Sequence, residues 1–221
     1  MKYKVLLLAL HTSSSRLPSG PCWHHSFHHL NLLNLMTTTL PQSIGRVALG
    51  TGLLLLIPLV AMQFTKEVNW TGSDFLFAGV VLFGAGSTFV LLARLGNSTF
   101  YKLAMAVAVG AGLLLVWANA AVGLVGSEHN PANLLYVAVL AVAFIGALVA
   151  RFRPLGTSWA MFAAALTYMV VTLVALFVWT PAAGTAEPSV HLANVLGFNA
   201  VFAFMWVVAG VLFRRAASSV Q

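Results

Sequence analysis

Residues 103–126 read LAMAVAVGAGLLLVWANAAVGLVG, and residues 127–136 continue as SEHNPANLLY. The first segment contains no ionisable residue. Its 24 residues would form a helix of roughly 36 Å at the usual rise per residue. Because that length exceeds a hydrocarbon core of about 30 Å, the segment predicts a tilted transmembrane helix. The polar residues after it predict a short connection to another helix.

The rest of the chain follows the same pattern. Of its 221 residues, 60% are hydrophobic and 7% charged, a composition typical of membrane proteins. Apolar spans occur at about 47–64, 75–93, 103–126, 132–150, 159–179 and 192–213. Short segments rich in Gly, Pro, Ser and Asn separate them. We therefore predict an all-α, polytopic helical bundle with about six transmembrane helices, formed by residues 36–221 as a single domain.

Charged residues mark the ends of these spans. Basic residues fall at alternate span ends, namely Arg46, Arg94, Lys102, Arg151, Arg153, Arg214 and Arg215. Acidic residues fall at the other ends, namely Glu67, Asp74, Glu128 and Glu187, and only Lys66 breaks the alternation. The positive-inside rule then predicts that both termini are cytoplasmic. Since the basic residues form no single patch, the net charge of +7 gives no reason to expect nucleic acid as a partner.

Residues 1–35 differ in composition from the spans. Lys2 and Lys4 precede only six apolar residues, which is short for a signal-peptide core. We expect residues 1–35 to be a disordered extension, or the start site to be misassigned. The histidines of 24–29 have metal-ligand chemistry but no framework, so no metal site is assigned to them. The lone Cys22 excludes an intrachain disulfide.

The polar connection near residue 130 has two interpretations. Asn130 followed by Pro131 is typical of a helix N-cap with proline at the first helical position. Glu128 would then lie near the positive end of the following helix dipole. Alternatively, Glu128, His129 and Asn133 line the mouth of a ligand-binding site.

This part of the chain also resembles a known family. The resemblance rests on residues in and after the 103–126 span, chiefly Trp117, Asn119, Gly126, Glu128, Asn130, Pro131 and Asn133. Together they are similar to the signature of a family of small bacterial multi-pass inner-membrane proteins with no assigned function. The resemblance covers roughly residues 70–177. It implies a location in the bacterial inner (plasma) membrane and supplies no mechanism.

The polar residues inside the spans are few. No Asp, Glu, Lys, Arg or His lies in a span interior, which argues against proton relays and many ion-coupled carriers. Nor do the spans contain a nucleophile with a base, so we expect neither enzyme activity nor a cofactor. Asn119, Thr172 and Asn199 should share one level, roughly 10–12 Å from the outer ends of their spans. They either join helices by hydrogen bonds, or Asn119 and Asn199 floor a shallow outer cavity rimmed by loop residues (Glu128, His129 and His191).

Two functions remain open from the sequence, besides the lipid bilayer as the surrounding partner. Small residues at helical spacing, Ala104, Ala108 and Gly112 together with Ala143 and Ala147, could bind partner helices or a second copy of the chain. That favours an accessory or assembly protein. The alternative is a small permease or channel with an outer-facing polar cavity. A broken helix would favour the permease, whereas continuous helices would favour the accessory role.

Overall fold

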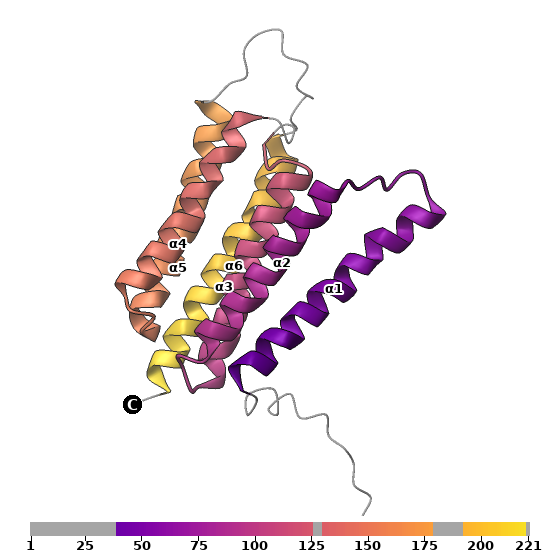
Figure 1. Ribbon diagram of the computed structural model, residues 1–221. Coiled ribbons are helices and arrows are strands. Elements are labelled where there is room, and N and C mark those ends of the chain that lie inside the picture. Colours follow the sequence, from indigo (N-terminus) through magenta and orange to yellow (C-terminus); the bar gives the residue numbers. More distant parts are fainter. Residues whose placement is uncertain (1–38, 126–129, 179–191, 220–221) are drawn as a thin grey trace, which may run out of the picture. The chain divides into compact units, whose positions relative to one another are not determined.

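The computed structural model describes residues 39–125, 130–178 and 192–219, with only the backbone for 192–194. Within these ranges the chain is helical, without strands, and six helices are long and apolar enough to cross a membrane. They are α1 (Leu40–Phe64), α2 (Gly72–Ala93), α3 (Thr99–Ala121), α4 (Val137–Val149) with the preceding 3₁₀-helix η2 (Pro131–Tyr136), α5 (Pro154–Phe177) and α6 (Leu192–Ser218) (Figure 1). The predicted fold class of a multi-pass helical membrane protein is confirmed. The expectations for residues 1–35, including Cys22 and the histidines of 24–29, lie outside the described residues.

Helices begin earlier than the hydrophobic spans because their first turns are polar. α1 begins at Leu40, where the Thr39 backbone N–H donates to Gln42 Oε1 at 3.3 Å in a capping box. α2 begins at Gly72, where the Thr71 backbone N–H donates to Asp74 Oδ2 at 2.7 Å. These caps satisfy backbone groups that the first helical turn leaves unpaired. Hydropathy alone does not detect such polar turns.

The core is built by α3, α4, α5 and α6. α5 packs against α4 and α6, and α6 also packs against α3. α2 packs on α3, and α1 packs on α2. The two N-terminal helices bury little, since α1 buries only Ser43 among the described residues and α2 only Ala78 and Ala93. Most apolar side chains of α1 therefore face lipid, as Ile57 does with 65% of its surface exposed.

Small residues allow the core helices to approach closely. A Cβ placed on Gly146 of α4 would lie 2.8 Å from Ala160 Cβ of α5. One placed on Gly210 of α6 would lie 2.7 Å from Phe162 Cε1 of α5. Both distances are too short for a real Cβ contact, so glycine is required for this packing. Such close contacts replace the hydrophobic driving force that lipid does not supply.

Two side-chain contacts bring basic residues to one end of the bundle. The Arg94 guanidinium, just after α2, donates to Ser43 Oγ in the first turn of α1 at 2.8 Å. The Arg214 guanidinium, near the end of α6, lies 5.4 Å from the centroid of the Trp159 ring in α5. The ends of α2 and α6 thus lie beside the starts of α1 and α5, and the alternating basic residues of the sequence gather on one side.

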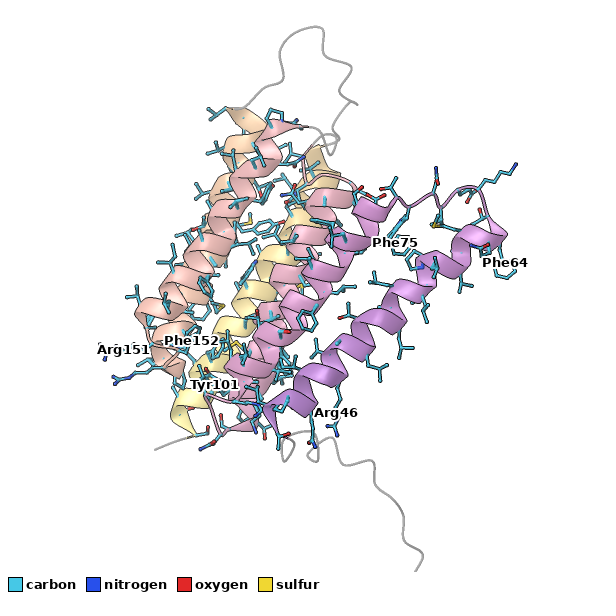
Figure 2. The ribbon with its side chains drawn as sticks, viewed as in Figure 1. Arg46, Phe64, Phe75, Tyr101, Arg151 and Phe152 are labelled. Atoms are coloured by element: carbon cyan, nitrogen blue, oxygen red, sulfur yellow. The ribbon has the colours of Figure 1, made fainter. Side chains whose placement is uncertain are left out.

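The turn between α4 and α5 has an unfavourable backbone at this same end. Arg151 and Phe152 have φ angles of 52° and 54°, and the left-handed region costs about 1–2 kcal/mol for each residue other than glycine. The Phe152 N–H donates to Ala147 O and the Arg151 N–H to Leu148 O, both at 2.8 Å. Tyr101 Oη of α3 donates to Phe152 O at 3.2 Å (Figure 2). These bonds hold Phe152 against the bundle and leave Arg151 exposed.

Candidate functional site

The third span ends earlier than the sequence predicts. α3 stops at Ala121 rather than near Gly126, because Gly123 adopts a left-handed φ of 73°. Its N–H donates to Ala118 O at 3.1 Å, as does the Val122 N–H at 3.0 Å. The apolar residues after Gly123 therefore leave the helix and turn back toward the bundle. Hydropathy does not reveal this ending because the turn is itself apolar.

The predicted cap at Asn130 is confirmed, but it starts a 3₁₀-helix rather than an α-helix. Asn130 Oδ1 accepts from the Ala132 N–H at 2.9 Å, and Pro131 occupies the first turn of η2. Asn133, 3% exposed, then binds the residues that follow α3, 122–125, which we call the α3 connection. Its Oδ1 accepts from the backbone N–H groups of Leu124 and Val125 at 2.9 and 3.0 Å. One buried amide thereby satisfies two backbone donors that have left the helix.

Asn119 bonds to the same connection. Its Nδ2 donates to Asn133 O at 2.9 Å. The side chain is part-buried and ties the last turn of α3 to η2. This bond joins Asn119 to Asn133 rather than to Asn199, with which the sequence analysis grouped it.

Thr172 and Asn199 do come together at the centre of the bundle, and Tyr136 joins them. All three side chains are fully buried. Tyr136 Oη of η2 donates to Asn199 Oδ1 of α6 at 2.9 Å and lies 3.0 Å from Thr172 Oγ1 of α5. Tyr168 Oη of α5 also donates to Asn199 Oδ1, at 3.0 Å. We call Asn119, Asn133, Tyr136, Tyr168, Thr172 and Asn199 the polar layer.

Asn199 uses its full hydrogen-bonding capacity within the protein. Its Nδ2 donates to Leu124 O at 3.1 Å and to Val195 O at 2.9 Å, while Oδ1 accepts the two tyrosine hydroxyls. Because backbone carbonyls only accept, these partners fix the orientation of the amide. An amide offers two donors and two acceptor positions, so every one is occupied.

The hydroxyl groups can also be satisfied together. Tyr136 and Tyr168 each use their single hydrogen on Asn199 Oδ1. Thr172 can then donate either to Tyr136 Oη at 3.0 Å or to Tyr168 O at 2.9 Å. Buried polar groups in a membrane are stable only with such partners. The central part of the polar layer is thus a closed network that joins η2, α5, α6 and the α3 connection.

The two tyrosines were not among the residues predicted for the site. Tyr168 lies four residues before Thr172, so the two share a face of α5. Tyr136 follows Asn133 by one helical turn. The sequence signal for both tyrosines was their spacing, because each lies one helical turn from a polar residue already predicted for the site.

The remaining predicted site residues are not among those that the structure describes. Glu128 and His129 fall in 126–129 and His191 in 179–191, outside the described residues. A ligand role for the polar layer therefore stays a prediction. In the part of the chain that the structure describes, no group of three or more His, Cys, Asp or Glu side chains could hold a metal ion.

Comparison with known protein families, with curated proteins and with solved structures finds no match in any of the three. What the chain does has therefore to be argued from its own contacts.

Proposed function

We propose that this integral membrane protein is a non-enzymatic accessory or assembly protein, acting through helix contacts with a partner membrane protein or a second copy. The observation that carries the proposal is a small-residue face on α1. Gly45, Ala48 and Gly52 follow the i, i+3, i+7 spacing of one helix face and are exposed. No atom lies within 4 Å of a Cβ placed on either glycine. Small exposed faces favour close helix association in lipid.

The small faces singled out from the sequence are used inside the chain. Ala104 and Ala108 of α3 and Ala143 and Ala147 of α4 are all buried by neighbouring helices. A helix of a partner protein cannot pack on these alanines without displacing the neighbouring helices of this chain. The proposed contact therefore uses α1, which packs mainly on α2 and buries only Ser43 among the residues that the structure describes.

The polar layer supports the accessory role over a transport role. A permease needs polar groups that face a substrate path near the middle of the membrane. Asn199 instead makes all four of its hydrogen bonds with protein atoms. Five of the six helices are also uninterrupted α-helices.

One observation favours the alternative of a small permease or channel with an outer-facing polar cavity. The fourth span begins as the 3₁₀-helix η2 before α4, and interrupted helices form the binding sites of many carriers. In this alternative Asn119, Asn133 and the tyrosines would line the outer mouth. A substrate would then have to replace the bonds between them.

The location follows from the charges and from the resemblance of residues 117–133. We infer a bacterial inner membrane, with the basic end of the bundle and both termini in the cytoplasm. Membership in the family of small bacterial inner-membrane proteins is part of the same proposal. The contact of Arg94 with Ser43 supports the proposed orientation, because it places the basic end of α2 beside the first turn of α1, near Arg46.

The test compares two glycines on opposite faces of α1. Gly52→Leu fills the small face, whereas Gly50→Leu adds the same side chain about 200° around the helix, at a position where a Cβ would also meet no atom within 4 Å. Native mass spectrometry of protein released from its own membrane should show a partner or second copy with the wild type and Gly50→Leu, and its loss with Gly52→Leu. A wild-type chain released alone, or equal behaviour of the two variants, would contradict the proposal.

A further inference from the structure

An apolar groove lies between α2, α3 and α4. Its volume is about 360 Å³, within the range of small-molecule sites. Apart from Thr88 and Thr157, the residues that line it are apolar. At its rim Val80 of α2 and Phe144 of α4 are 64% and 57% exposed. In a membrane-spanning bundle, the groove therefore opens sideways to lipid.

Small residues on three helices leave this space open. Each helix lines the groove with two of them, namely Gly84 and Ala85, Ala108 and Gly112, and Ala143 and Ala147. A Cβ placed on Gly84 would meet no atom within 4 Å. Larger side chains at these positions would occupy the groove.

The groove extends over one half of the bundle. Its lining on α2 runs from Val80 to Leu92, roughly 18 Å of helix rise, and on α3 from Met105 to Val116, roughly 16 Å. Leu92 is next to the last residue of α2, so the groove begins at that end of the bundle. One leaflet contributes half of a hydrocarbon core of about 30 Å. The length of the groove therefore fits one acyl chain of one leaflet.

Lys102 of α3 lies at the end where the groove begins. It precedes Met105 by three residues and Val109 by seven, and this spacing puts all three on the groove face of α3. Lys102 is partly buried. A lysine in such a position lays its methylene stem along apolar surface and keeps its ammonium group in water. This ammonium group would therefore lie at the level of the lipid headgroups, beside the start of the groove.

The turn between α4 and α5 brings further positive charge to the same place. Phe152 lines the groove and is flanked in sequence by the exposed Arg151 and Arg153. Tyr101 Oη donates to Phe152 O at 3.2 Å, so this turn lies beside the first turn of α3 (Figure 2). Three basic residues thus surround the start of the groove.

No acidic side chain in the described ranges offsets this charge. The acidic residues of these ranges are Glu67 and Asp74. Asp74 is in the first turn of α2, roughly 27 Å by helix rise from Leu92 at the end of the same helix, and Glu67 precedes α2. The start of the groove therefore suits an anionic group attached to an apolar chain.

We propose that the groove binds one acyl chain of an anionic phospholipid, whose phosphate contacts the Lys102 ammonium group. Arg151 and Arg153 attract the same headgroup, as basic sites between membrane helices do for anionic lipids. The chain then follows the small residues of the groove toward the middle of the membrane. This site is independent of the proposed partner face on α1.

Other occupants match the groove less well. A zwitterionic phospholipid could insert a chain, but its cationic group would find no carboxylate among the described residues of this end. A helix of a second copy would cross the whole membrane, whereas the groove ends near the middle of α2 and α3. An anionic phospholipid matches both the length and the charge.

The test titrates the delipidated full chain in detergent with dioleoyl phosphatidylglycerol or dioleoyl phosphatidylcholine and counts bound lipids by native mass spectrometry. The first phosphatidylglycerol should bind about fivefold more tightly than the first phosphatidylcholine, the effect of one basic residue on an anionic headgroup. Lys102→Gln should remove this preference and leave phosphatidylcholine binding unchanged. Gly84→Leu should abolish the first binding of both lipids by filling the groove.

Matched controls separate the groove from the rest of the surface. Arg46→Gln removes an exposed basic residue near the start of α1, which does not line the groove, and Gly110→Leu adds a side chain to α3 outside the groove lining. Both should bind the two lipids as the wild type does. The melting temperature of each variant checks its folding, and if Gly84→Leu fails to fold, the pair Lys102→Gln and Arg46→Gln decides.

Several results would overturn the proposal. Equal binding of the two lipids by the wild type, or an unchanged preference in Lys102→Gln, would show that Lys102 does not select the headgroup. An equal loss of preference in Arg46→Gln would assign the selection to the whole basic end rather than to the groove. Unchanged lipid binding in folded Gly84→Leu, or loss of a second copy of the chain in place of lipid, would show that the groove does not hold an acyl chain.

Discussion

Replacing Asn199 by leucine should destabilise the bundle, because it removes the hub of the polar layer. The substitution keeps the approximate size of the side chain but eliminates its bonds to Tyr136, Tyr168 and Leu124 O. The fourth bond, to Val195 O, is within α6, and that carbonyl keeps its position in the helical ladder. The loss is therefore three bonds between different segments.

The expected magnitude follows from hydrogen bonds measured inside membranes. These average about 0.6 kcal/mol and reach about 1.7 kcal/mol. Three such bonds predict a loss of about 2 kcal/mol in the free energy of unfolding, with an upper limit of about 5 kcal/mol. Tyr168→Phe removes a single bond to Asn199, so it should cost about 0.6 kcal/mol.

Unfolding in mixed micelles with a rising fraction of dodecyl sulfate, followed by circular dichroism, measures these free energies. Thr167→Val is the control, because Thr167 is only partly buried and its hydroxyl donates to Ala163 O in its own helix. It should change stability by no more than about 0.5 kcal/mol. In the Asn199→Leu, Tyr168→Phe double variant the two losses should not add, because both remove the same bond. Full additivity, or an Asn199→Leu effect no larger than that of the control, would refute the reasoning.

Further predictions concern the connections, the packing and the orientation. Asn133→Ala should speed hydrogen exchange at the two backbone amides that its side chain binds, and unchanged exchange would show that water or other groups replace it. Gly146→Leu should destabilise the fold by about 1–3 kcal/mol, measured by the same micelle titration, because its Cβ would lie 2.8 Å from a side chain of α5. In a Cys22→Ser background, a membrane-impermeant maleimide added to intact cells should label Glu67→Cys but not Arg153→Cys. The opposite labelling would reverse the proposed orientation.

The spans could be predicted from sequence because hydropathy directly reports transfer into lipid. Their ends could not, since a helix ends where backbone geometry changes. Gly123 ends α3 inside an apolar run, and the next residues differ little in hydropathy from the helix itself. Similarly, the polar cap at Asn130 marked a helix start but did not reveal that the first turns of this span are 3₁₀.

The polar layer was predictable in its level but not in its pairing. Thr172 and Asn199 were placed at one depth from helix rise alone, and Tyr136 does join them. Asn119 was placed at the same depth, yet it bonds to Asn133 O. Depth fixes one coordinate of a side chain, whereas its partner also depends on rotation about the helix axis and on which helices are neighbours. Those two quantities come from packing between distant segments.

The position of Asn199 in the last helix has a consequence for biosynthesis. The ribosome completes α3, η2, α4 and α5 before α6 exists, so Tyr136 and Tyr168 enter the membrane without their shared acceptor. The backbone oxygen of Leu124 likewise lacks its donor, Asn199 Nδ2, until α6 is made. A nascent chain that stops before residue 199 therefore lacks the amide that accepts from both tyrosine hydroxyls and donates to the Leu124 backbone oxygen. Insertion of the sixth helix supplies this amide, so the central hydrogen bonds of the bundle can form only after the last helix has entered the membrane.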